Sequence, residues 1–144
     1  MKAKRNSGFS LVEILVVLVI MGLLISVVAP TVLNRADDAR VQKAQADFNA
    51  IETALKIYRL DNYVYPTTEQ GLQALVEAST LAPEPQNFKV GGYLEEVPID
   101  PWGRPYLYLS PGEQRSVDIY SLGADGLSGG EDQSADIGNW KEED

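Results

Sequence analysis

The chain has 144 residues, 44% of them apolar and 23% charged, a composition that suits one globular domain and excludes wholesale disorder. Its 21 acidic and 12 basic side chains give a net charge of -9, so it lacks the basic surface that nucleic-acid binding requires. It contains no Cys and no His, which excludes disulfides, thiolate or imidazole metal sites and His-based catalysis. We therefore expect neither an enzyme nor a nucleic-acid-binding protein.

A long apolar segment follows a basic N-terminus. Residues 9–33 carry a single charge, at Glu13, and as a helix they would extend roughly 37 Å, enough to cross the roughly 30 Å core of a bilayer. Three basic side chains within residues 1–8 predict that this end stays in the cytoplasm and that the acidic body is exported. Two alternatives stay open here, a secretory signal peptide cut after Ala29 and a plain membrane anchor.

Neither alternative explains Glu13. A carboxylate within a membrane-spanning helix costs roughly 2.5–3.5 kcal/mol on insertion scales, so it is a functional candidate whose partner must be identified.

The residues around Glu13 carry a family resemblance. The leader Arg5-Asn6-Ser7-Gly8, followed by Phe9-Ser10-Leu11-Val12-Glu13, resembles the class III leader of type IV pilins and type II secretion pseudopilins. The resemblance implies that a prepilin peptidase cuts after Gly8 on the cytoplasmic side and methylates the new N-terminus at Phe9.

Cleavage after Gly8 would create an amino group on Phe9 close to the Glu13 carboxylate. In an assembled bundle, Glu13 of one subunit could pair with the Phe9 amine of a neighbour, and such a pair would fix the axial register because a shifted subunit leaves two buried charges unpaired. Two alternatives stay open, a protonated Glu13 and a pair with the Phe9 amine of the same chain.

The next segment, residues 34–62, has a helical composition without Gly or Pro. Apolar side chains recur in it at spacings of three and four, which predicts one stripe packed against a C-terminal domain: Val41, Ala44, Phe48, Ile51, Leu55 and Tyr58. We expect Pro30 to kink the helix without ending it, so that residues 9–62 form one bent helix.

The remaining residues, 63–144, predict a small head. We expect a short helix from Thr67 to about Ala78 and two strands, at residues 106–109 and 117–121, joined by a hairpin turn at Pro111-Gly112. The predicted fold class is α+β, with a long N-terminal helix packed on a short antiparallel sheet. The predicted divisions are a leader (1–8), an apolar half-helix (9–33), an amphipathic half-helix (34–62) and a periplasmic head (63–144).

Segments of the head extend the resemblance over essentially the whole chain. YPTTEQGL, VPIDPWGRPYLY, SLGADG and DIGNW are similar to the major pseudopilins of type II secretion systems, which have a type IV pilin-like fold. A type IV pilin would usually carry a C-terminal disulfide loop, which this chain cannot form. We interpret Trp102 and its neighbouring prolines as a rigid packed turn.

Residues 122–139, called the acidic loop below, combine five glycines with four acidic side chains. Oxygen ligands gathered by a Gly-rich turn suit calcium, which takes six to eight oxygens, better than magnesium. From the residues alone, calcium is only somewhat favoured over a solvated acidic turn.

The resemblance implies a structural calcium ion in this loop, because the major pseudopilins need calcium there for folding and fibre formation. Its ligands on this chain would be the Leu122 carbonyl and the side chains of Asp125, Asp132 and Ser134, with Asp136 as a further candidate.

The resemblance also implies the function and the partners. We expect the major subunit of a type II secretion pseudopilus, held by one span in the bacterial inner membrane with its head in the periplasm, and polymerised into a helical homopolymer that drives export of folded proteins. The implied partners are minor pseudopilins, the prepilin peptidase and an inner-membrane platform protein with its cytoplasmic ATPase. Alternatives are a type IV pilin, a monomeric membrane-anchored calcium-dependent binding module, or a hydrolase using Asp118 or Asp125.

Overall fold

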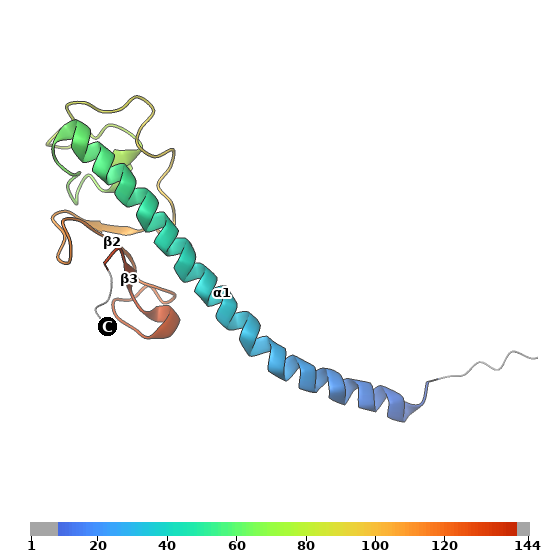
Figure 1. Cartoon of the computed structure of the whole chain (residues 1–144). Helices are drawn as coiled ribbons and strands as arrows, with labels where there is room; N and C mark the ends of the chain where they lie inside the picture. Colours follow the sequence, from blue (N-terminus) through green and yellow to red (C-terminus); the bar gives the residue numbers. More distant parts are fainter. Residues whose placement is uncertain (1–8, 141–144) are drawn as a thin grey trace, which may run out of the picture. The chain divides into compact units, whose positions relative to one another are not determined.

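The computed structural model describes residues 9–140, without the side chains of residues 27–34. The predicted leader and its cleavage site at Gly8 lie outside the described residues. In chain order the elements are a helix α1, a 3-10 helix η1, strands β1 and β2, a 3-10 helix η2 and a strand β3 (Figure 1). The chain divides into two compact units, Met1–Asp38 and Ala39–Asp144.

Helix α1 (Leu11–Asn62) is continuous through position 30, and its end agrees with the predicted end at residue 62. It stops because Tyr63 adopts a left-handed backbone conformation, with φ at 67°. The Tyr63 N–H donates to the Arg59 carbonyl at 2.7 Å, which satisfies one of the last free carbonyls of the helix.

In the first unit, α1 presents an apolar surface to its surroundings. Large apolar side chains from Leu11 to Ile25 are between 47% and 78% exposed. A surface of this kind contributes nothing to the stability of an isolated subunit in water until another apolar surface covers it.

In the second unit, α1 supplies one side of the core. Five of the six residues of the predicted stripe are at most 2% exposed: Ala44, Phe48, Ile51, Leu55 and Tyr58. The sixth, Val41, was assigned wrongly, because it lies one turn before the packed region and is 42% exposed. Phe48 meets Tyr106 edge to face, with ring centroids 5.2 Å apart, so the helix packs directly on the residues beside the sheet.

The sheet has three antiparallel strands in the order β1-β2-β3, which confirms the α+β class (Figure 1). Strands β1 (Leu107–Leu109) and β2 (Asp118–Ser121) each begin one residue after the predicted start. Strand β3 (Ile137–Gly138) was not predicted, since two residues are too short to show an alternating pattern.

The connection between β1 and β2 differs from the predicted tight turn at Pro111-Gly112. It runs from residue 110 to 117 and is organised by Asp118, which is 2% exposed. The Asp118 carboxylate accepts the N–H groups of Glu113, Gln114 and Arg115 at 2.6–2.9 Å. These contacts give Asp118 a structural role. The hydrolase alternative that uses Asp118 required a reactive carboxylate at this position.

The predicted helix from Thr67 to Ala78 is also wrong, because only η1 (Leu72–Leu75) forms there. The Leu75 carbonyl, which would continue a helix by accepting from residue 79, instead accepts from Tyr93 and Leu94 at 2.7 and 3.1 Å. Thr67 exchanges hydrogen bonds with Gln70 in both directions, the pattern of a capping box, but here it closes a turn and not a helix, since Gly71 is the N-cap of η1.

Candidate functional site

The first candidate site is the start of α1, where Glu13 lies. Phe9 and Ser10 precede the helix, and Glu13 Oε2 accepts a hydrogen bond from the Ser10 N–H at 2.8 Å. Ser10 and Glu13 have the S-x-x-E spacing of a capping box, in which the acidic side chain satisfies a backbone N–H at the helix start. Sequence analysis missed this local role, although the spacing signals it.

The membrane prediction concerns the same end of the chain. In residues 9–140, no helix is long and apolar enough to cross a membrane. The predicted span at 9–33 includes positions 27–33, whose side chains lie outside the described residues.

The second candidate site is the acidic loop, which begins directly after β2 and contains β3 near its end. At its start the Leu122 carbonyl accepts the Gly126 N–H at 3.2 Å, and Asp125 Oδ1 accepts the Leu127 N–H at 2.9 Å. The Ala124 N–H donates to the Gln133 carbonyl at 2.8 Å, which ties this turn to the second half of the loop. The loop therefore has a defined backbone conformation.

The second half of the loop contains η2 (Asp132–Ser134). Asp132 has a left-handed φ of 51°, which is uncommon for a residue other than glycine. Asp136 Oδ2 accepts the Gly129 N–H at 2.9 Å, whereas Asp136 Oδ1 is buried and has no hydrogen-bond partner. A buried carboxylate oxygen without a partner is unfavourable, so this atom is suited to accept a ligand.

The calcium ion expected in this loop stays a prediction. Among residues 9–140, no three acidic side chains are grouped so that they could hold a metal ion. The donor set is nevertheless all oxygen, which suits a hard cation such as calcium. The unpartnered Asp136 Oδ1 is the single observation of the structure that favours a ligand there.

A turn before the sheet also contacts the acidic loop, and sequence analysis assigned it no such role. Asp100 is 3% exposed, and its Oδ1 accepts the N–H groups of Trp102 and Arg104 at 3.0 and 2.7 Å. Its Oδ2 accepts the Ser121 hydroxyl at the end of β2, at 2.5 Å. From this rigid turn, Arg104 reaches the carbonyls of Gly123 and Ala124 at the start of the loop.

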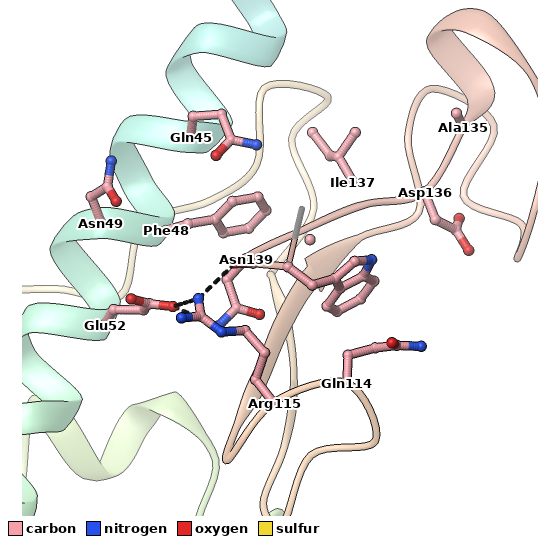
Figure 2. Close-up of a pocket in the computed structure, with 12 residues that line it drawn as sticks. Gln45, Phe48, Asn49, Glu52, Gln114, Arg115, Ala135, Asp136, Ile137 and Asn139 are labelled. Carbon is pink, nitrogen blue, oxygen red and sulfur yellow. Dashed lines mark hydrogen bonds and ion pairs between the residues drawn. The ribbon is translucent and has the colours of Figure 1, made fainter. Parts of the chain in front are cut away.

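The end of the acidic loop is held against α1 by Asn139 (Figure 2). Its side-chain amide donates to Glu52 at 2.8 Å and to the Val117 carbonyl at 3.2 Å, and its Oδ1 accepts the Ile119 N–H. Arg115 donates to both Glu52 and the Asn139 carbonyl, at 2.7 and 2.8 Å. Sequence analysis missed this cluster because its members are distant in the chain.

Burial would raise the pKa of Glu52, but hydrogen bonds from Asn139 and Lys56 and the charges of Arg115 and Lys56 outweigh it, so this pKa lies below its ordinary value of 4.5. Glu52 is therefore ionised at neutral pH. Glu52, Arg115 and Asn139 also border a groove of about 1420 Å³ between α1 and residues 135–140 (Figure 2).

Comparison with known proteins identifies the class and then the family. Residues 3–29 match a family model described as "Prokaryotic N-terminal methylation motif", so the chain carries the N-terminal signature of the pilin-like class. Residues 31–140 match a model described as "Type II secretion system (T2SS), protein G". The chain belongs to the type II secretion system protein G family, which confirms the resemblance seen in the sequence.

Individual relatives agree with this membership. The chain is 53% identical to the "Type II secretion system core protein G" of Pseudomonas aeruginosa, over 97% of this chain and 99% of the relative. It is 52% identical to the protein of the same name from Vibrio cholerae, over 99% of this chain and 97% of the relative. A crystal structure of the major pseudopilin from the type 2 secretion system of enterohaemorrhagic Escherichia coli matches with a TM-score of 0.68 and 49% identity, covering 75% of this chain and 92% of that one.

Proposed function

We propose that the chain is the major structural subunit of a type II secretion pseudopilus, which polymerises into a periplasmic fibre that drives export of folded proteins across the outer membrane. The observation that carries this function is the family match over residues 31–140. The sequence identity of 52–53% to two core G proteins, over nearly the full chain, agrees with it. A pseudopilin subunit of type II secretion is the role that these relatives and the matching pseudopilin structure support.

The proposal includes processing at the N-terminus. A prepilin peptidase would cut after Gly8 and methylate Phe9, which the match of residues 3–29 to the N-terminal methylation motif supports. Before assembly the chain would be anchored in the bacterial inner membrane by residues 9–33, with the head in the periplasm.

Assembly would use the exposed apolar side chains at the start of α1. If one face of this apolar half-helix packs on a different face of the next copy, the contact is head-to-tail, and head-to-tail contacts that do not close a ring grow into a helical homopolymer. Glu13 would exchange its Ser10 partner for the Phe9 amine of a neighbour. Minor pseudopilins, the inner-membrane platform protein and its cytoplasmic ATPase are the further partners that we propose, since extraction from the membrane requires energy from outside this chain.

The acidic loop would bind a structural calcium ion through the Leu122 carbonyl and the side chains of Asp125, Asp132 and Ser134, with Asp136 as a further ligand. When bound, the ion would neutralise negative charge on the head and connect the two halves of the loop. The unpartnered Asp136 Oδ1 and the all-oxygen donor set support this assignment.

The function is tested by complementation. In a host that lacks its own core protein G, expression of this chain should restore secretion and yield pseudopilus filaments under electron microscopy. Mass spectrometry of the mature subunit should show a chain that begins at methylated Phe9. A host that makes the folded subunit but neither secretes nor forms filaments would refute the pseudopilin assignment.

The calcium site needs its own experiment. Calcium should raise the melting temperature of the detergent-solubilised chain, and Asp125→Ala should abolish this rise. Glu69→Gln, which alters an exposed carboxylate outside the loop, should leave the rise unchanged. If Asp125→Ala responds to calcium as the wild type does, Asp125 is not a ligand.

A further inference from the structure

Arg104 is the basic side chain that contacts the start of the acidic loop. Its Nη2 donates to the Gly123 and Ala124 carbonyls, both at 2.7 Å. Lys43, Lys56 and Arg115 each pair with a carboxylate. Within residues 9–140, by contrast, Arg104 has no carboxylate partner within salt-bridge distance, although the loop beside it carries four acidic side chains. Arg104 therefore holds backbone carbonyls of the loop in place and forms no ion pair with the loop carboxylates.

The position of these two carbonyls matters for the proposed ligands. Gly123 and Ala124 lie between Leu122 and Asp125, the first two candidate ligands in the chain. The Leu122 carbonyl accepts the Gly126 N–H at 3.2 Å and keeps a second lone pair, and Asp125 keeps its Oδ2 beside the bond that Oδ1 makes. Arg104 thus immobilises the two peptide units that connect one candidate ligand to the next.

Arg104 is itself held in place from two sides. Its backbone N–H donates to the buried carboxylate of Asp100 at 2.7 Å. On the other side its guanidinium packs against Gly126, where an added Cβ would come within 1.8 Å of Nη1. Only glycine at position 126 leaves room for the guanidinium.

We infer that Arg104 is a positioning residue for the cation site of the acidic loop, because it orders the turn at residues 122–126 before an ion binds. This inference rests on the calcium part of the proposed function. A loop that is ordered in advance loses less conformational entropy on binding, so its affinity for the ion is higher. Lysine at this position would keep the charge but not the planar geometry with which a guanidinium donates to both carbonyls.

The first test measures calcium binding to the full chain in detergent by isothermal titration calorimetry. Arg104→Met and Arg104→Lys should each weaken calcium affinity by about tenfold or more, which corresponds to about 1.4 kcal/mol. The rise in melting temperature between EDTA and calcium should shrink in both variants. A merely structural role would lower the melting temperature equally in both conditions and leave the affinity unchanged, and that result would overturn the inference. Full affinity in Arg104→Lys would also overturn it, since the paired N–H groups of the guanidinium would then not be needed to order the turn.

The second test moves the Arg104 side chain without substituting it. It tests the inference even if the Arg104 variants do not fold. Gly126→Ala should weaken calcium binding because its methyl group pushes the guanidinium away. Gly91→Ala is the matched control, because Gly126 and Gly91 both have positive φ, at 71° and 88°, but Gly91 lies outside the acidic loop and an added Cβ there meets nothing within 4 Å. Equal affinities in the two glycine variants would refute the role of Arg104. A wild type that does not bind calcium would refute the calcium site itself, and the inference with it.

Discussion

The two halves of α1 differ in where their apolar side chains lie, although they belong to one continuous helix. From Leu11 to Ile25 its apolar side chains are exposed, whereas from Ala44 to Tyr58 one stripe is fully buried within the same chain. The buried stripe stabilises the head of each subunit. The exposed half does not stabilise the subunit until another apolar surface covers it.

Among the variants that test this difference between the two halves, we expect Glu13→Gln to have the largest effect. The amide can still accept the Ser10 N–H, so the start of α1 keeps its local contact while the charge is lost. Because breaking a buried ion pair costs about 3–5 kcal/mol, filament yield and secretion should fall by about a hundredfold or more. The melting temperature of the subunit should not change.

Electron microscopy and a secretion assay measure this effect, and Glu69→Gln provides a matched loss of one exposed carboxylate in the head. Normal filaments in Glu13→Gln would show that the first half of α1 assembles through apolar contacts alone.

The next largest effect is a difference in the free energy of unfolding between matched substitutions in the two halves of α1. Leu55→Ala removes a side chain that is 0% exposed, so it should lower the free energy of unfolding by about 2–5 kcal/mol in denaturant titration. Leu15→Ala makes the same chemical change at a side chain that is 54% exposed and should leave that free energy unchanged. Equal losses in both variants would mean that the two halves do not differ as described.

A third substitution extends the comparison from apolar to polar contacts in the head. Asp118→Asn replaces one of the two accepting oxygens by an N–H₂ group, which then faces at least one of the three backbone N–H donors, and it removes the charge that all three stabilise. Hydrogen bonds to a charged group contribute about 1.5–3 kcal/mol, so we expect a loss of about 2 kcal/mol in denaturant titration. An unchanged unfolding midpoint would show that the Asp118 carboxylate does not stabilise the connection between β1 and β2.

The smallest effect depends on pH. The pKa of Glu52 is lower in the folded chain than in the unfolded chain, so its contribution to stability is present above about pH 4.5 and is lost as the pH falls through the folded pKa. Because the side chains of its partners Arg115 and Lys56 are 48% and 64% exposed, we expect about 1 kcal/mol or less. The difference in melting temperature between wild type and Glu52→Gln should be constant from pH 5 to 7 and shrink below pH 4.5. A difference that persists at pH 3 would exclude ionisation as its cause.

The sequence predicted those features that repeat along the chain. The three-and-four spacing identified five of the six stripe positions, and the two strands predicted on either side of Pro111-Gly112 each begin within one residue of β1 and β2. Strand β3 was missed because only its pairing with Tyr120 and Ser121 defines it. The helix predicted after Thr67 failed because distant N–H groups of Tyr93 and Leu94 occupy the Leu75 carbonyl.

The candidate sites follow the same division. Gly8, Phe9 and Glu13 form a local motif that could be identified from the sequence, and the acidic loop was evident from its composition. Arg104 and Asn139 could not be identified, because each acts through hydrogen bonds to residues about 20 or more positions away. Such contacts leave no periodic trace in a single sequence.

The contacts of Asn139 have a practical consequence for anyone who wishes to label or shorten this protein. Glu52 and Asn139 are separated by 87 positions but bonded directly, so Asn139 fastens the chain to α1 near its C-terminus. Removal of Asn139 would deprive Ile119, Val117 and Glu52 of a bonding partner at once. Fluorophores and affinity tags therefore belong after Trp140, and every truncation should retain Asn139.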